Sequence, residues 1–104
     1  MGIRVWITFD LGVRGDYDGL YKWLDEQKAL ECVDSTATFF WDYSENMKTE
    51  IKESLQNSVE FKKTDRIYLI FQKPDNGYTG SFIIGKRKAS RWEGYSVEST
   101  EDDE

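Results

Sequence analysis

Asp10 is the residue whose type and position point most directly to chemistry. It ends an alternating segment, residues 3–9, and precedes a loop with two glycines. The backbone fixes a carboxylate at a strand end, and such a loop leaves room for water and phosphate, so Asp10 could help to hold Mg²⁺ in a catalytic site. An aspartate there can also anchor the loop by accepting bonds from its amides. Because one carboxylate is a poor Mg²⁺ site, two copies of Asp10 from a symmetric dimer would serve better.

The loop after Asp10 is a candidate phosphate-binding segment. Residues 12–15 are Gly-Val-Arg-Gly and precede a predicted helix, whose N-terminus favours anions. Arg14 would give a phosphate a charged donor. The spacing matches neither the dinucleotide-binding pattern nor the P-loop. Two glycines are equally typical of a turn that needs positive φ.

A cationic segment near the C-terminus is the second candidate for phosphate contact. Lys86, Arg87, Lys88 and Arg91 occur with no acid among them, and Trp92 follows. Cations suit a nucleic-acid backbone, and an indole ring suits a stacked base. The segment therefore predicts binding to RNA or DNA. Its alternatives are structural: the charges could protect a sheet edge from aggregation, or dock the chain's own acidic C-terminus.

The chain has one cysteine, Cys32, and no histidine. An intramolecular disulfide, a Cys/His zinc site and Ser-His-Asp or Cys-His catalysis within one chain are therefore excluded. Cys32 has no basic neighbour in sequence that would activate it. No apolar run approaches the ~20 residues of a membrane span, and the first residues lack the order of a signal peptide. We expect a cytoplasmic protein without a membrane segment.

Charge is unevenly distributed along the 104 residues. The net charge is −6, but residues 98–104 hold five acids and no base, so that removing them leaves −1. A chain of this length forms one domain of common size. The sequence predicts a single folded domain over residues 1–97 and a disordered acidic tail over residues 98–104.

Periodicity predicts the elements that carry the candidate residues. Residues 3–9 alternate as a strand does. Asp16 is a suitable N-cap for a helix that ends near residue 28. The apolar stripe of this helix is Tyr17, Leu20, Tyr21 and Leu24. Residues 30–33 and 36–41 predict two strands, with one long, bulged strand as the alternative.

The second half of the chain repeats the order. Ser44 is a suitable cap for a second helix, whose apolar residues Met47, Ile51, Leu55 and Val59 recur every four positions. Residues 66–73 alternate again, and Pro-Asp-Asn-Gly at 74–77 predicts a turn into a hairpin strand over residues 78–85. Residues 89–95 are predicted to be irregular or a short edge segment.

This order predicts an α+β domain of the ferredoxin-like kind. Two right-handed βαβ units give a βαββαβ antiparallel sheet with two helices on one face, and the hairpin adds a C-terminal strand. We expect Trp6, Trp23 and Trp41 in the core rather than as platforms for bases. The free edge of the added strand predicts pairing with a second copy in a homodimer.

Several short motifs resemble a known superfamily. They are Ile7-Thr8-Phe9-Asp10, Ser35-Thr36, Asp65-Arg66-Ile67-Tyr68 and Trp92-Glu93-Gly94. Over residues 3–95, the chain resembles the small ferredoxin-like proteins that include the dimeric CRISPR-associated partner of the spacer integrase and the VapD-type toxin ribonucleases. It departs from their pattern at Phe9, where relatives often have Tyr, and at Leu11-Gly12, where basic residues often follow. The acidic C-terminus is also atypical.

The resemblance implies a homodimer with Asp10 near its axis. In some members this aspartate supports Mg²⁺-dependent phosphodiester cleavage, whereas others bind DNA or partners without cutting. Three hypotheses follow. The first is a homodimeric nucleic-acid- or partner-binding module, the second is a Mg²⁺-dependent endoribonuclease that uses Asp10 from each protomer, and the third is a stand-alone regulatory protein without a nucleic-acid role.

Overall fold

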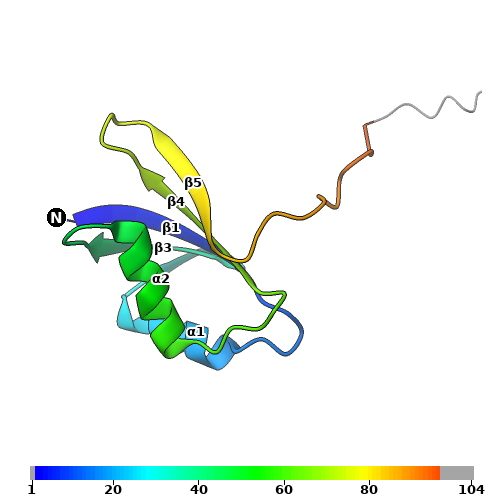
Figure 1. Ribbon diagram of the computed structural model, residues 1–104, viewed down its shortest axis with the longest axis horizontal. Helices are drawn as coiled ribbons and strands as arrows, with labels where there is room; N and C mark the ends of the chain where they lie inside the picture. The colour runs from blue at the N-terminus through cyan, green and yellow to red at the C-terminus, as the bar shows by residue number, and fades with distance from the viewer. Residues whose placement is uncertain (1, 97–104) are drawn as a thin grey trace, which may run out of the picture.

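The computed structural model describes residues 2–96 and has an α+β architecture, with two helices and a five-stranded antiparallel sheet (Figure 1). The strands are β1 (Gly2–Asp10), β2 (Leu30–Val33), β3 (Thr36–Asp42), β4 (Arg66–Gln72) and β5 (Tyr78–Ile84), and the helices are α1 (Tyr17–Glu26) and α2 (Met47–Ser58). The sheet order is β2-β3-β1-β4-β5. The predicted order of helices and strands along the chain is confirmed, including separate β2 and β3. The predicted tail at residues 98–104 lies outside the described residues.

The two helices begin with side-chain caps. The Oδ1 atom of Asp16 accepts a hydrogen bond of 2.9 Å from the Gly19 N–H, as predicted for α1. For α2 the prediction was wrong by two residues, because Asn46 is the N-cap and accepts from the Thr49 N–H at 3.0 Å. Ser44 instead donates its N–H and hydroxyl to Glu50, which folds back from the first turn of α2.

One face of the sheet and both helices form the hydrophobic core. In a strand, successive side chains point to opposite faces, so alternate residues of β1, β3 and β4 enter the core. Its buried members include Val5, Ile7, Phe9, Ala37, Phe39, Ile67 and Leu69 from the sheet, and Leu20, Trp23, Leu24, Met47, Ile51 and Leu55 from the helices. Figure 1 shows α1 and α2 close together on one side of the sheet.

The tryptophans divide between the two faces. Trp23 is buried, and its Nε1 donates to the Ser54 Oγ at 2.8 Å, while Trp41 packs against the core. The core prediction was wrong for Trp6. The pleat of β1 turns this side chain to the opposite face, where it lies edge-on to Tyr78 with ring centroids 6.1 Å apart.

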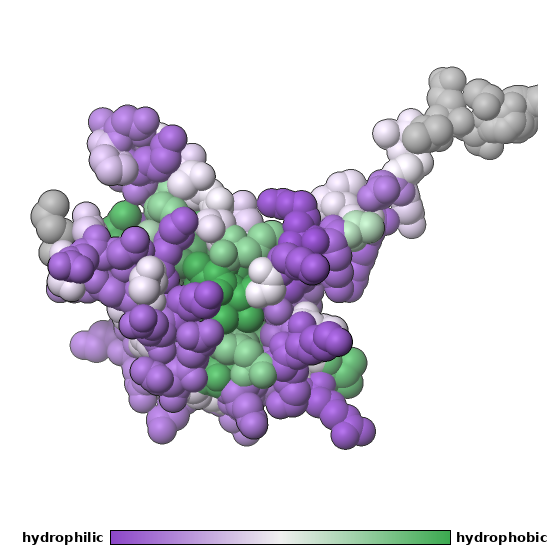
Figure 2. Space-filling view, in the orientation of Figure 1, coloured by the Kyte–Doolittle hydropathy of each residue, from purple (hydrophilic) through white to green (hydrophobic). Residues whose placement is uncertain are grey.

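The surface is divided between polar and apolar residues. In Figure 2, hydrophilic residues cover the tip of the β4–β5 hairpin and much of the helical surface, and apolar residues show in a patch at the centre of the view. No described helix has the length and apolar composition needed to cross a membrane.

Candidate nucleic-acid interface

The side of the sheet opposite the core, here called the open face, carries Asp10 and borders a cavity that two further candidates, Arg87 and Trp92, help to line. Cross-strand register sets Arg4 opposite Phe40 and Tyr68 opposite Phe82. The open face comprises Arg4, Trp6, Thr8, Asp10, Thr36, Thr38, Phe40, Asp42, Arg66, Tyr68, Ile70, Gln72, Tyr78 and Phe82. No helix of the described chain packs on this face, so its rings, hydroxyls and charges are available to a ligand.

Asp10 forms an ion pair with Arg66 at one end of the open face. The two residues are cross-strand partners, and Arg66 Nη2 lies 2.5 Å from Asp10 Oδ2. The hydrogen bond from Arg66 holds the pKa of Asp10 below its usual range, although partial burial opposes it, and the charges of Arg66, Lys88 and Arg91 add to the lowering. Two of the predicted cations, Lys88 and Arg91, therefore lie near Asp10.

A cavity of about 400 Å³ lies against this ion pair. Its walls combine two hydroxyls, three rings and three charged groups, from Thr8, Asp10, Arg66, Tyr68, Phe82, Arg87 and Trp92. The Arg87 guanidinium lies over two of the rings, 5.4 Å from the Phe82 centroid and 5.9 Å from that of Tyr68. Trp92 is 74% exposed. This cavity, here called the Arg87 cavity, offers cations for phosphate and rings for a base.

A cationic cleft of about 380 Å³ adjoins the Arg87 cavity and shares Arg66 and Arg87 with it. The other lining residues are Lys63, Thr64, Asp65, Gly85, Lys86 and Lys88. Gly85 has φ of 76°, and a Cβ there would lie 2.4 Å from the Asp65 carbonyl oxygen. Only glycine fits this bend, which turns the chain from β5 past the start of β4. Buried Arg66 Nε has no hydrogen-bond partner among residues 2–96.

Asp65 is an important residue whose role the sequence did not reveal. Its side chain is 1% exposed and accepts hydrogen bonds from the Gly12 N–H at 2.8 Å and the Lys62 N–H at 2.7 Å. Asp65 thus ties the β1–α1 loop to the start of β4. The loop-anchoring function considered for Asp10 belongs to Asp65, and the available signal was an acid directly before a predicted strand.

The structure does not bring Arg14 to either cationic cavity. Arg14 is exposed in the β1–α1 loop, and the Gly12 N–H that might have met a phosphate is occupied by Asp65. The positive φ considered for this loop is also wrong, since the described glycines with positive φ are Gly85 and Gly94. Gly15 is instead required by close packing, because a Cβ there would lie 2.4 Å from the Leu11 Cβ.

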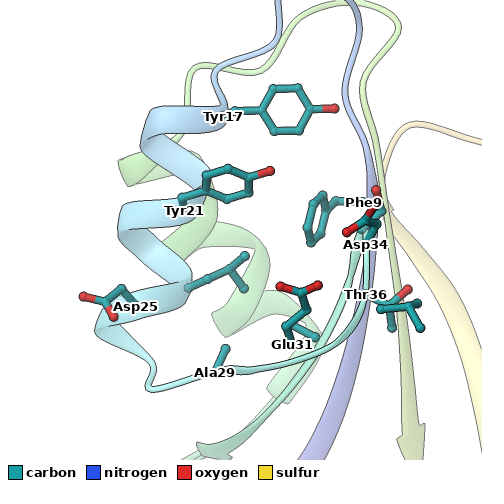
Figure 3. Close-up of a pocket in the computed structure, with 12 residues that line it drawn as sticks. Phe9, Tyr17, Tyr21, Asp25, Ala29, Glu31, Asp34 and Thr36 are labelled. Carbon is teal, nitrogen blue, oxygen red and sulfur yellow. The ribbon is translucent and has the colours of Figure 1, made fainter.

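A third cavity, of about 540 Å³, has the opposite charge. It lies between α1 and the β2–β3 pair and is lined by acids such as Asp25, Glu31 and Asp34, and by rings including Tyr17 and Tyr21 (Figure 3). No Lys or Arg contributes to its lining. Its carboxylates would repel phosphate. A polyanion is therefore attracted to the open face rather than to this side of the molecule.

The surroundings of Asp10 do not fit a Mg²⁺ site within one protomer. The carboxylate is already paired with Arg66, and Lys88 and Arg91 add positive charge nearby. Mg²⁺ prefers several oxygen ligands in octahedral geometry. Over residues 2–96, no group of three or more Cys, Asp or Glu residues is arranged to hold a metal ion.

Comparisons with protein-family models, with curated proteins and with solved structures found no match. The superfamily resemblance therefore stays a hypothesis that depends on the short motifs and on the order of the elements.

Proposed function

We propose that this protein is a homodimeric, ferredoxin-like module that binds nucleic acid through the cationic end of its open face. The observation that carries the proposal is the convergence of separate segments on the Arg87 cavity. Arg66 reaches it from β4 and Arg87 and Trp92 from the chain after β5. The charges of Lys88 and Arg91 act on the same site, because they lower the pKa of Asp10.

The ferredoxin-like assignment is supported by the order of strands and helices. Within the sheet, β4-β1-β3-β2 is the order expected for two interleaved βαβ units, and β5 is added beside β4. Helices follow β1 and β3, and both contribute to one core. Right-handed crossovers would place both helices on the same face, which leaves the other face for binding.

Local charge supports a polyanionic ligand despite the net charge of −6. Asp10, the acid that lines the Arg87 cavity, is already paired with Arg66. The remaining cations can therefore contact phosphates and release counterions. At physiological ionic strength the Debye length is about 8 Å, so distant acids are largely screened.

The homodimer is supported by the position of β5 at the edge of the sheet. In the described chain β5 pairs with β4 alone, so its outer backbone groups are available to a second strand. Pairing of two β5 edges would continue the sheet across the dimer. This arrangement would leave the open face of each protomer uncovered.

A charge-removal experiment tests the nucleic-acid proposal. The triple variant Lys86→Gln, Arg87→Gln, Lys88→Gln removes three charges from the site. Its matched control, Lys22→Gln, Lys48→Gln, Lys52→Gln, removes three from exposed positions of α1 and α2. Fluorescence anisotropy with a labelled oligonucleotide should show much weaker binding for the site variant and near wild-type binding for the control.

The salt dependence gives an independent readout of the same experiment. Each phosphate contact contributes roughly 0.7 to the slope of log affinity against log salt for a single strand, or roughly 0.9 for a duplex. The slope of the site variant should fall accordingly, while that of the control is retained. Equal weakening of both variants would show that only net charge matters. Absence of wild-type binding would refute the proposal and leave the partner-binding or regulatory hypothesis.

A further inference from the structure

The open face is aromatic well beyond the Arg87 cavity. We infer that its ligand is a single-stranded nucleic acid whose bases stack across the sheet from the Arg87 cavity to Phe40 and Tyr78. This inference rests on the proposed function and extends it, because it names the form of the nucleic acid and a surface away from the cationic segment.

Three strongly exposed rings are distributed over the width of this surface. Phe40 on β3 and Tyr78 at the start of β5 are each 62% exposed, and Trp92 after β5 is 74% exposed. Ile70, on β4 between them, is 39% exposed. Bases of any sequence can stack on such rings, because every base has a π-face.

The length of the open face suits a few nucleotides. Along β1 it extends from Arg4 to Asp10, and a strand rises about 3.3 Å per residue, which gives roughly 20 Å. Four-stranded sheets that bind single-stranded RNA stack two or three bases on their rings. Phe40 at one end and the Arg87 cavity at the other are therefore separated by a distance that several bases can bridge.

Gly80 leaves space for the Tyr68 ring at the centre of the open face. A Cβ at Gly80 would lie 2.3 Å from the Tyr68 hydroxyl oxygen, so the Tyr68 ring lies across the backbone of β5 where no side chain intervenes. Tyr68 also contacts Phe82 edge-on, with centroids 4.8 Å apart. The rings thus form a floor on which a flat base can rest.

Cations occur at both ends of this floor. The Arg4 guanidinium lies 4.2 Å from the Phe40 centroid at one end, and Arg87 lies over Phe82 and Tyr68 at the other. Of the acids on this face, Asp10 is paired with Arg66, and Asp42 lies at the end that carries Arg4. A strand of phosphates can be held at both ends while its bases stack between, since guanidinium groups bind phosphate and also stack on bases.

Charge also disfavours the competing occupants of the face. A second copy laid face to face, with one Arg87 cavity against the other, would bring cations against cations. A duplex would satisfy the cations, but its bases are stacked on one another and present no free π-face. A single strand uses both the charges and the rings.

The experiment compares a labelled single strand with its matched duplex, using wild type, Phe40→Ala, Tyr78→Ala and Tyr21→Ala. Tyr21 is an exposed ring beside the acidic cavity and serves as the control. The wild type should prefer the single strand. Phe40→Ala and Tyr78→Ala should each weaken single-strand binding about fivefold or more with an unchanged salt slope, while Tyr21→Ala binds as wild type does.

Three outcomes would overturn the inference in distinguishable ways. Equal affinity for both forms with no effect of the ring variants would refute stacking, although binding through residues 86–88 would stand. Phe40→Ala protein that loses its dimeric mass in light scattering, with unchanged oligonucleotide affinity, would assign the face to a second copy. No binding of either form by the wild type would remove the proposed function itself.

Discussion

Replacement of Asp65 should destabilise the domain far more than replacement of any exposed acid. The carboxylate is 1% exposed and accepts two backbone hydrogen bonds, of 2.7 and 2.8 Å. Asp65→Ala removes both acceptors and leaves the N–H groups of Gly12 and Lys62 without them. An unsatisfied buried donor costs about 1–3 kcal/mol. Since Lys62 is exposed and water can reach its N–H, we expect a total loss of about 2–3 kcal/mol in the free energy of unfolding.

Thermal and urea unfolding followed by circular dichroism measure this loss. For a domain of this size the expected fall in Tm is roughly 10–20 °C. Asp65→Asn keeps one acceptor and should lose about half as much. Asp25→Asn is the control, because the Asp25 side chain is exposed and no described hydrogen bond involves its carboxylate, and it should change stability by less than about 0.5 kcal/mol. If Asp65→Ala and Asp25→Asn unfold at the same Tm, Asp65 does not anchor the β1–α1 loop.

Four further predictions concern charge and assembly. Asp10→Asn should lower stability by about 0.2–1 kcal/mol through loss of the ion pair with Arg66, and Mg²⁺ should not change the stability of either form. A variant that is more stable than wild type and has lost Mg²⁺-dependent RNA cleavage would support the ribonuclease hypothesis instead. Light scattering at micromolar protein should give twice the mass of one chain, and a monomer would exclude the β5-edge dimer. Deleting residues 98–104, which removes five acids, should strengthen binding at low salt and lose its effect as salt rises; equal binding by both forms would contradict competition. Finally, hydrogen bonds, the strongest from the Glu45 N–H, lower the pKa of Glu50 from 4.5 to about 2. The stability that ionised Glu50 contributes is therefore complete above pH 4.5 and is lost as the pH falls toward 2. Thermal melts of Glu50→Gln over the same pH range should lack this loss of stability.

Local patterns predicted most of the fold. Period-two alternation identified β1, β3 and β4, and the Pro-Asp-Asn-Gly turn was correct, with Asn76 at φ of 73°. Helical spacing identified α1 and α2. The missed cap at Asn46 differs from the predicted Ser44 by two residues. Both are preferred N-cap types, and in the structure Asn46 accepts from the Thr49 N–H while Ser44 donates to Glu50.

The site was predicted only where its residues are neighbours in sequence. The segment from Lys86 to Trp92 was identified, because its charges and ring lie within seven positions. The partner of Asp10 is 56 residues away in Arg66, and only strand register brings the two together. The same limit applies to Asp65, whose partner Gly12 is 53 residues distant. Trp6 was assigned to the core from its type, whereas its position in the pleat decided its face.

The most direct test of the account is to titrate isotope-labelled protein with a single-stranded oligonucleotide and to record amide chemical shifts by NMR. If nucleic acid binds the open face, the largest changes occur at open-face positions such as Arg4, Phe40 and Tyr68 and in the segment that carries Arg87 and Trp92. The α1 side, with its acidic cavity, should remain unchanged. Shifts confined to the α1 side, or no shifts at low salt, would contradict nucleic-acid binding by the open face.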